Sequence, residues 1–284
     1  MTGRAASIAA RLNATAVSRG LSFQYATLLY MHEGFMRRLS ASGFKERFIL
    51  KGGLLLQCLA PTSSRTTKDI DLLGTGIGNN AAALRQVFVT IVVIDEDDSL
   101  NFDTETMELE DIAESNEYAG IRLHVTCRLG NIRNRMQVDV GFGDAVTGSP
   151  CEIDYPLLVD GRPFSVVSYP LPVVIAEKFE AMVALADANS RMKDYWDVAF
   201  ILKSFALIDD EIETALHATF KRRGTPMPGE PIVFAPGYET SERMLTLWSA
   251  FLRRTRLPSI TWRDTLVIIR DRLQPIYSRI RRPL

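Results

Sequence analysis

The segment from residue 51 to residue 73, KGGLLLQCLAPTSSRTTKDIDLL, constrains the fold of this chain more strongly than any other part of the sequence. Its end alternates polar and apolar residues, which predicts a strand that presents Asp69 and Asp71 on one face and buries the residues between and after them. The pair Gly52-Gly53 stands between a short apolar strand and an apolar helical stretch. Two carboxylates on one face of a strand, near a glycine turn, are therefore the first candidates for chemistry.

These carboxylates repel each other unless cations lie between them, and two hard divalent cations are what phosphoryl transfer from a nucleoside triphosphate needs. Asp139 is a third candidate ligand, because it lies between two valines in a strand predicted over 136–142. The bare backbone N–H groups of the glycine pair, at the start of a helix, can hold phosphate. Four further residues beside these elements are candidate phosphate contacts: Lys51, Arg65, Thr67 and Lys68.

The order of predicted elements places a mixed α/β core between two helical regions. Two amphipathic helices precede it, and a seam between 150 and 172 follows it, marked by Pro156, Pro163, Pro170 and Pro172. We therefore expect an α+β protein in which residues 1–165 hold the N-terminal helices and the core, and residues 166–284 form a helical domain. The predicted helices are 4–19, 22–41, 79–90, 172–187, 192–205, 209–222, 240–255 and 261–282.

Composition excludes several classes of protein. Apolar residues make up 46% and charged residues 24% of the 284 residues, as in globular proteins, and no apolar run approaches the ~18 residues of a membrane helix. The three cysteines and three histidines are scattered without the spacing of a disulfide framework or a metal site. Few cysteines, no secretory signal and no membrane segment predict a cytoplasmic protein.

Charge is distributed unevenly, although the formal net charge is only −1. The segment 95–117 carries 11 acidic residues and no basic one, which is typical of a solvated face. The segment 241–284 carries 10 arginines against 3 acidic residues, a surplus of +7. Guanidinium groups suit bidentate phosphate contact, so this segment is the first candidate for binding RNA. The next candidates are Arg37, Arg38, Arg191 and Lys193.

Four motifs in this order resemble a known family. Gly52-Gly53 and the run 65–71 (RTTKDID) look like the glycine pair and the Asp-hydrophobic-Asp signature of the DNA polymerase β-type nucleotidyltransferase superfamily. The runs 137–144 (QVDVGFGD), 176–181 (AEKFEA) and 190–197 (SRMKDYWD) resemble the second acidic strand, the helical lysine motif and the Arg-x-Lys-Asp motif of the AbiEii/AbiGii toxin family, which includes the MenT-type toxins. The order and spacing of the resemblance hold from about residue 20 to residue 205.

The resemblance implies a polymerase β-like nucleotidyltransferase core with a mixed sheet, flanked by N-terminal helices and a C-terminal helical bundle. It also implies that Asp69, Asp71 and Asp139 are catalytic and hold two Mg²⁺ ions. Many members of the superfamily have Gly-Ser where this chain has Gly52-Gly53, so backbone N–H groups would have to bind phosphate without a serine hydroxyl. Gly-Gly is also common within the toxin family, so the departure does not imply inactivity.

The two helical motifs add a second set of implied site residues. Lys178 is expected to contact the triphosphate or the leaving group. One acidic residue of the fourth motif, either Asp194 or Asp197, is expected to assist catalysis, and the choice between them stays open. Arg191 and Lys193 are expected to contact nucleotide phosphates or substrate RNA.

The activity implied is Mg²⁺-dependent nucleotide transfer, of the EC 2.7.7 type, by a toxin of a toxin–antitoxin or phage-defence pair. A nucleotide would pass from a nucleoside triphosphate to an RNA acceptor such as the 3′ end of tRNA, pyrophosphate would leave, and growth would stop. The implied partner is a cognate antitoxin, often of the winged-helix type in this family. Two alternatives are a nucleotide-binding module without chemistry, which has no reason to keep three repelling carboxylates, and a metal-dependent nuclease, which does not use the Gly-Gly turn.

Overall fold

The computed structural model describes residues 3–115, 118–255 and 257–281 of the chain. Contacts between Cα atoms divide the chain into two compact units: residues 1–143 and 150–168 form unit 1, and residues 144–149 and 169–284 form unit 2. The three predicted carboxylate ligands belong to unit 1, and the two helical motifs belong to unit 2. The division expected between residues 165 and 166 stays a prediction.

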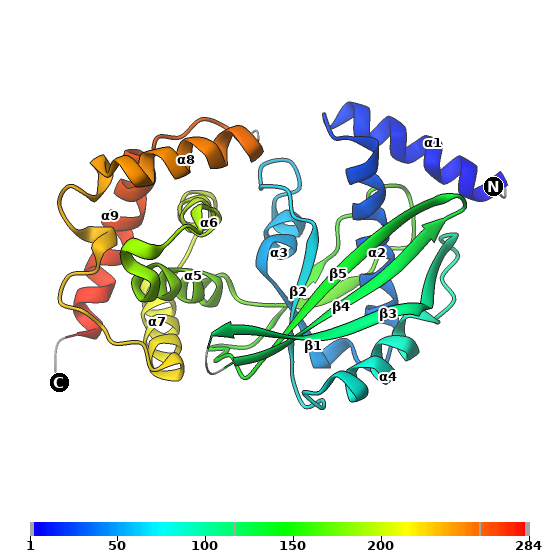
Figure 1. Cartoon of the computed structure of the whole chain (residues 1–284), viewed down its shortest axis with the longest axis horizontal. Coiled ribbons are helices and arrows are strands. Elements are labelled where there is room, and N and C mark those ends of the chain that lie inside the picture. Colours follow the sequence, from blue (N-terminus) through cyan, green and yellow to red (C-terminus); the bar gives the residue numbers. More distant parts are fainter. Residues whose placement is uncertain (1–2, 116–117, 256, 282–284) are drawn as a thin grey trace. The chain divides into compact units, whose positions relative to one another are not determined.

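Unit 1 is built on one sheet in the strand order β3-β4-β5-β2-β1-β7-β6 (Figure 1). β2 pairs with β5 and β1 pairs with β7 in parallel, whereas the other neighbours are antiparallel. The prediction of an α+β fold with a mixed sheet is therefore confirmed. The strands are β1 (Phe48–Lys51), β2 (Asp69–Gly74), β3 (Leu100–Ser115), β4 (Tyr118–Leu129), β5 (Ile132–Phe142), β6 (Cys151–Asp154) and β7 (Ser165–Ser168).

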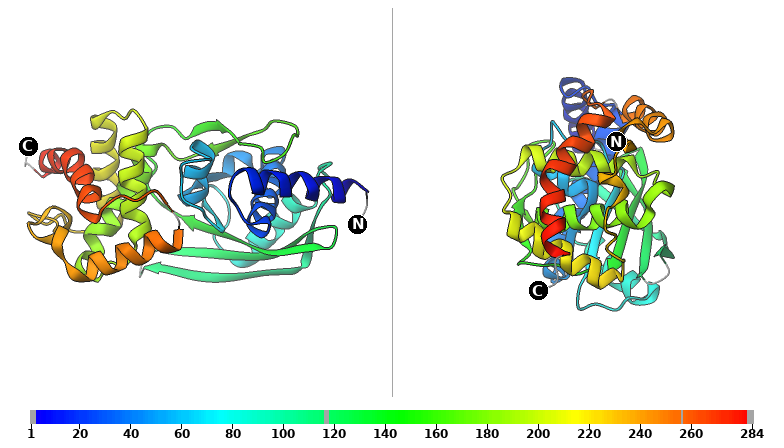
Figure 2. Two further views of the ribbon diagram at one scale, coloured as in Figure 1. Left: turned by 90° about the horizontal axis from the view of Figure 1, so that it is seen from above. Right: turned by 90° about the vertical axis from the view of Figure 1, so that its left-hand side faces the viewer.

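The two faces of this sheet differ in polarity, because successive residues of a strand point to opposite faces. On the apolar face, Leu123 of β4 and Ile70 of β2 are fully buried. Helices cover this face, where the rings of Phe35 (α2) and Phe88 (α4) lie 6.0 Å apart. Figure 2 (left) shows α1 and α2 together on one side of the long strands. The helices of unit 1 are α1 (Gly3–Ser18), α2 (Phe23–Ala41), α3 (Gly52–Leu59) and α4 (Ala81–Val92).

The structure differs from the sequence-based expectations in three places of unit 1. The proline-containing seam holds two strands, β6 and β7, that the sequence did not predict. Strands of four residues are too short to show a periodic pattern. The sequence over 107–112 predicts only a short strand, but β3 extends over 16 residues because its pairing with β4 continues on both sides. In the first helix, helical spacing predicts Val17 on the same apolar face as Leu12. Val17 is instead 75% exposed, and Ala16 takes that place because it lies four residues after Leu12.

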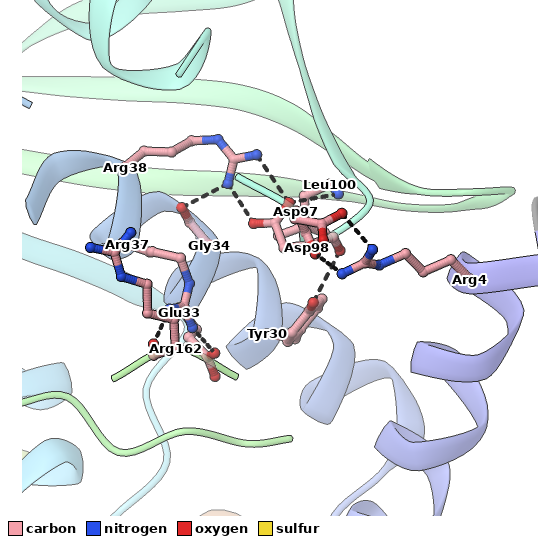
Figure 3. A network of polar contacts seen from close by, with 10 residues as sticks. All are labelled: Arg4, Tyr30, Glu33, Gly34, Arg37, Arg38, Asp97, Asp98, Leu100 and Arg162. Atoms are coloured by element: carbon pink, nitrogen blue, oxygen red, sulfur yellow. Dashed lines mark hydrogen bonds and ion pairs between the residues drawn. The ribbon is translucent and has the colours of Figure 1, made fainter. Parts of the chain in front are cut away.

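A buried ion pair fixes the start of β3 to α2 (Figure 3). Arg38 donates to both carboxylate oxygens of Asp98, at 2.5 and 3.0 Å, and only 2% of Arg38 is exposed. Asp98 also accepts the backbone N–H of Leu100 at 3.0 Å. Arg37 is buried too and pairs with Glu33 at 2.8 Å. The expectation of a solvated acidic face is therefore wrong at Asp98, and both arginines are committed to the fold rather than to nucleic acid.

Asp98→Asn is expected to lower the free energy of unfolding by about 3 kcal/mol, because the buried Arg38 loses its carboxylate. Asp97 offers a matched control: its side chain is 84% exposed and pairs with the exposed Arg4 at 2.5 Å. Asp97→Asn is therefore expected to cost less than about 1 kcal/mol. Urea denaturation of the two variants measures the difference, and equal losses would contradict the role of the buried pair.

His32 on α2 is fully buried, and neither of its ring nitrogens has a hydrogen-bond partner among the described residues. Burial lowers its pKa from 6.5 to about 4, because a charged imidazole would lose its hydration there; the charge of Asp69 opposes this shift only in part. The folded protein therefore holds His32 in its neutral form at neutral pH.

Stability is expected to fall as the pH drops from 6.5 to about 4, because in this window the unfolded chain protonates His32 and the folded chain does not. The loss attributable to His32 is about 3 kcal/mol in total, and above this window the residue adds no pH dependence. His32→Leu should lack this part of the pH profile, whereas His217→Gln, at an exposed histidine, should keep it. Thermal denaturation over the window checks the prediction, and identical profiles for His32→Leu and the unmodified protein would refute it.

Unit 2 is helical in its described residues, as the sequence predicted. Phe179 of α5 lies at its centre, with the rings of Phe220, Phe234 and Tyr277 at 6.3, 5.5 and 5.8 Å. No helix of the described residues combines the length and the apolarity that crossing a bilayer requires. The helices are α5 (Leu171–Leu185), α6 (Met192–Ser204), α7 (Asp209–Arg223), α8 (Glu242–Thr255) and α9 (Trp262–Ile280). Short 3₁₀ helices are η1 (Lys45–Arg47), η2 (Ala186–Ala188), η3 (Ile232–Phe234) and η4 (Tyr238–Thr240).

Candidate active site

The parallel pairing of β2 with β5 brings the three predicted carboxylates together. Asp71 lies directly opposite Asp139 in this pairing, and Asp69 lies two residues earlier on the same face of β2. The intervening Ile70 is fully buried and anchors the strand. One oxygen of each carboxylate can be chosen so that all three atoms lie within 4.8 Å of one another. An all-oxygen donor set of this size fits a hard divalent cation.

Asp139 is held in place by two neighbours that the sequence motifs did not reveal. Arg122 of β4, its cross-strand partner, donates Nε to Oδ1 and Nη2 to Oδ2, both at 2.8 Å. This bidentate hydrogen bonding to Asp139 raises the pKa of Arg122. Gln137 donates its amide to both oxygens of Asp139, at 3.2 and 3.0 Å. The third carboxylate is therefore oriented by a fixed cation and by an amide, which together donate two hydrogen bonds to each of its oxygens.

Gly52 places the start of α3 against Asp71. Its φ is +66°, a left-handed conformation that favours glycine, and an added Cβ would lie 2.0 Å from Oδ2 of Asp71. No side-chain hydrogen bond from Lys51 caps the first turn of α3. The backbone N–H groups of this turn are therefore suited to bind an anion beside the carboxylates.

Gly53 gives space to two of the predicted phosphate contacts. An added Cβ would lie 2.8 Å from Oγ1 of Thr67 and 3.0 Å from Nη1 of Arg65. Thr67 is fixed from both sides, because its backbone N–H donates to the hydroxyl of Tyr25 at 3.0 Å and its hydroxyl donates to Asp69. A hydroxyl thus stands beside the glycine where many superfamily members have serine. The structure brings Thr67 and the buried Arg65 to the glycine turn.

The two predicted lysine contacts of unit 1 differ in position. Lys51 ends β1 directly opposite Asp71 and is partly buried. Lys68 immediately precedes β2 and is exposed. Both therefore lie next to the carboxylate strand, Lys51 on the side of β1 and Lys68 at its beginning.

In unit 2 the predicted helical residues form a buried ionic cluster. Nζ of Lys178 lies 2.8 Å from Oδ1 of Asp194 and 2.8 Å from Oδ2 of Asp197, and both aspartates are fully buried. Nε of Arg191 lies 2.6 Å from the other oxygen of Asp194. Burial alone would raise the pKa of Asp194, but Lys178 and then Arg191 outweigh it and hold that pKa below its usual value. Lys193 is exposed on the first turn of α6. Because Lys178 contacts both aspartates, the choice between them stays open.

The family described as "Nucleotidyl transferase AbiEii toxin, Type IV TA system" matches residues 34–266. The chain belongs to this family. The match extends well beyond the motif region and includes β1 to β7 and most of unit 2. The family's place in toxin–antitoxin systems implies an antitoxin as partner of this AbiEii-family protein.

Two solved structures share the fold of this AbiEii-family protein. One is JHP933 from Helicobacter pylori, with a TM-score of 0.50, 12% identity and coverage of 92% of this chain and 94% of that one. The other is a protein from H. pylori described provisionally as a nucleotidyltransferase, with the same score and identity and coverage of 92% and 97%. Among proteins with curated descriptions, the comparison found no significant relative.

The arginine-rich segment 241–284 of this AbiEii-family protein offers less positive charge for RNA contact than its sequence suggested. Three of its arginines pair with acidic residues, at 3.7 Å for Arg270, 2.7 Å for Arg272 and 2.7 Å for Arg279. Arg253 and Arg254 are exposed at the end of α8, whereas Arg256 and Arg282 lie outside the described residues. These ion pairs reduce the charge that the segment can offer to RNA.

Proposed function

We propose that this AbiEii-family protein is a Mg²⁺-dependent toxin that transfers a nucleotide from a nucleoside triphosphate to the 3′ end of an RNA, with tRNA as the expected acceptor. The observation that carries the proposal is the group of Asp69, Asp71 and Asp139, whose oxygens lie within 4.8 Å of one another beside the α3 N-terminus at Gly52. Three carboxylates at this spacing repel one another unless cations neutralise them, so the arrangement is suited to metal-dependent phosphoryl transfer.

The residues have separate roles in the proposed reaction. The 3′ hydroxyl oxygen of the RNA attacks the α-phosphorus, the bond from that phosphorus to the β-phosphate oxygen breaks, and pyrophosphate leaves. Asp139, oriented by Arg122, accepts the hydroxyl proton and passes it to water. The α3 N-terminus at Gly52 and the guanidinium of Arg65 hold the triphosphate. Two Mg²⁺ ions bound by the carboxylates would neutralise charge on the phosphate oxygens.

The transfer would inactivate the RNA and arrest growth, in a toxin–antitoxin or phage-defence setting in the cytoplasm. A winged-helix antitoxin would relieve the arrest. Lys178, one of Asp194 and Asp197, Arg191 and Lys193 would contribute to nucleotide or RNA contacts, as the family resemblance implies.

The test is incubation of the purified protein with total RNA, Mg²⁺ and each α-labelled ribonucleoside triphosphate in turn. Label in the RNA together with released pyrophosphate is the expected result, and a chelator should abolish both. Shortened RNA without label would identify a nuclease. Nucleotide binding without label or pyrophosphate would identify a binding module, and either outcome would overturn the proposal.

A further inference from the structure

A cavity of about 470 Å³ lies beside the carboxylates within unit 1. Its lining comes from the first turns of α2, from the residue before β2, and from β4 and β5. Among the lining side chains are three basic ones, Lys68, His124 and Arg135, together with Tyr25 and several amides. Lys68 is the one predicted phosphate contact in this lining. The α3 N-terminus and Arg65, which hold the triphosphate in the proposed reaction, do not line the cavity, so that reaction does not yet use it.

Gln137 of β5 connects the cavity to the carboxylates. Gln137 lines the cavity and donates to both oxygens of Asp139. The same residue lies opposite Asp69 in the pairing of β2 with β5, and opposite His124 in the pairing of β4 with β5. A ligand in this cavity therefore lies next to the place where the transferred phosphate is held.

The strand order indicates which substrate approaches from the side of β5, where the cavity lies. β2, with its two carboxylates, lies between β1 and β5. The glycine turn that would hold the triphosphate follows β1, whereas the sheet residues of the cavity belong to β5 and β4. In phosphoryl transfer the attacking and leaving oxygens lie roughly in line on opposite sides of the phosphorus. With pyrophosphate on the β1 side, the attacking hydroxyl comes from the β5 side.

The charges of the cavity suit a polynucleotide. Lys68 is exposed and makes no ion pair with the described residues. Arg135 pairs with Glu108 at 2.5 Å, but these side chains are 57% and 68% exposed, so the pair is weak and phosphate can replace the carboxylate. The ring of Tyr25 and the amides add the stacking and base-edge contacts by which single-stranded RNA ends are bound.

We propose that this cavity binds the 3′-terminal nucleotides of the RNA acceptor, with Lys68 and Arg135 on the phosphates, and so brings the terminal hydroxyl to Asp139. The inference rests on the proposed nucleotide transfer and adds to it the location of the acceptor. It also predicts that two neighbouring residues of opposite charge, Arg135 and Glu108, have opposite effects on RNA binding.

The experiment compares three variants of the full chain with the unmodified protein in the transfer assay with unfractionated tRNA. Lys68→Gln with Arg135→Gln should raise KM for tRNA about tenfold, and should reduce the slope of log KM against log salt by about 1.4, or about 0.7 for each lost phosphate contact. Glu108→Gln frees Arg135 and should lower KM for tRNA about twofold. Arg162→Gln, at an exposed cation of unit 1 outside the cavity, should match the unmodified protein. KM for the triphosphate should stay within about twofold in all variants.

Fluorescence anisotropy with a labelled single-stranded RNA of about ten nucleotides measures the RNA affinity of each variant without turnover, and the variants should rank as in the transfer assay. The proposal is supported when Arg135→Gln weakens and Glu108→Gln strengthens RNA binding. It is overturned when both changes act in the same direction or have no effect, when only KM for the triphosphate responds, or when label passes to protein instead of RNA. Absence of transfer by the unmodified protein would instead refute the proposed function, while the binding order still decides whether the cavity holds RNA.

Discussion

Asp71→Asn is expected to reduce nucleotide transfer by about 10³-fold or more, because several kcal/mol of charge stabilisation would depend on the metal ions that the carboxylates are proposed to hold. The substitution keeps the shape of the side chain and removes one of three charges whose oxygens lie within 4.8 Å of one another. Relief of this repulsion should leave the melting temperature unchanged or slightly higher. Asp69→Asn should behave in the same way.

Release of pyrophosphate and growth of cells expressing each variant measure activity, and thermal denaturation measures stability. Asp111→Asn is the matched control, because Asp111 is an exposed carboxylate of the same sheet outside the site. Full transfer or full toxicity with either Asp69→Asn or Asp71→Asn would remove the two-metal assignment. A loss of activity that merely followed a lowered melting temperature would also count against it.

The carboxylate site could be predicted from the sequence because its information is local. Alternation over 69–73 places Asp69 and Asp71 on one face, and the two valines beside Asp139 identify a strand of the same kind. The structure adds the register, in which Asp71 faces Asp139 across adjacent parallel strands. The glycine pair was recognised as a turn, but its closeness to Asp71 depends on the pairing of β1 with β2.

The partners of these residues could not be predicted, because they depend on pairing between distant segments. Arg122 lies on a strand whose alternation is evident, and that pattern marks it as polar-facing. Only the register of β4 against β5 makes it the partner of Asp139. Asp98 likewise looks like one residue of an acidic run, and its burial becomes evident only from its contact with Arg38 on α2. β6 and β7 escaped prediction since four residues carry too little periodicity.

The burial of Lys178 also depends on contacts with another helix, and it changes what the sequence predicts for stability. The helical spacing of 172–187 places it off the centre of the apolar stripe, which by itself predicts that its removal affects activity and leaves the melting temperature nearly unchanged. In the structure it is 8% exposed and is the shared partner of two fully buried aspartates. Two buried carboxylates without this cation would carry a high desolvation cost. Removal of Lys178 is therefore expected to lower stability as well as activity.

Lys178→Met is now expected to lower the free energy of unfolding by about 3–5 kcal/mol, which is the usual cost of removing one partner from a buried ionic group. Lys203→Met, at an exposed lysine of α6, should change it by less than about 0.5 kcal/mol. Calorimetry or urea denaturation of the two variants provides the comparison. A Lys178→Met protein as stable as the unmodified one would show that the cluster is not what holds α5 to α6.

The triple variant Lys178→Met, Asp194→Asn, Asp197→Asn separates stability from catalysis. It removes the lysine and both carboxylates together, so no charge is left buried without a partner, and most of the lost stability should return. If Lys178 also contacts the triphosphate, transfer should stay about 10²–10³-fold below that of the unmodified protein in spite of the restored fold. The change should appear in kcat or in KM for the triphosphate, and pyrophosphate release measures both. Recovery of transfer along with stability would make Lys178 a residue of the helical core alone, and unit 1 would then carry the chemistry through its carboxylates, the glycine turn and Arg65.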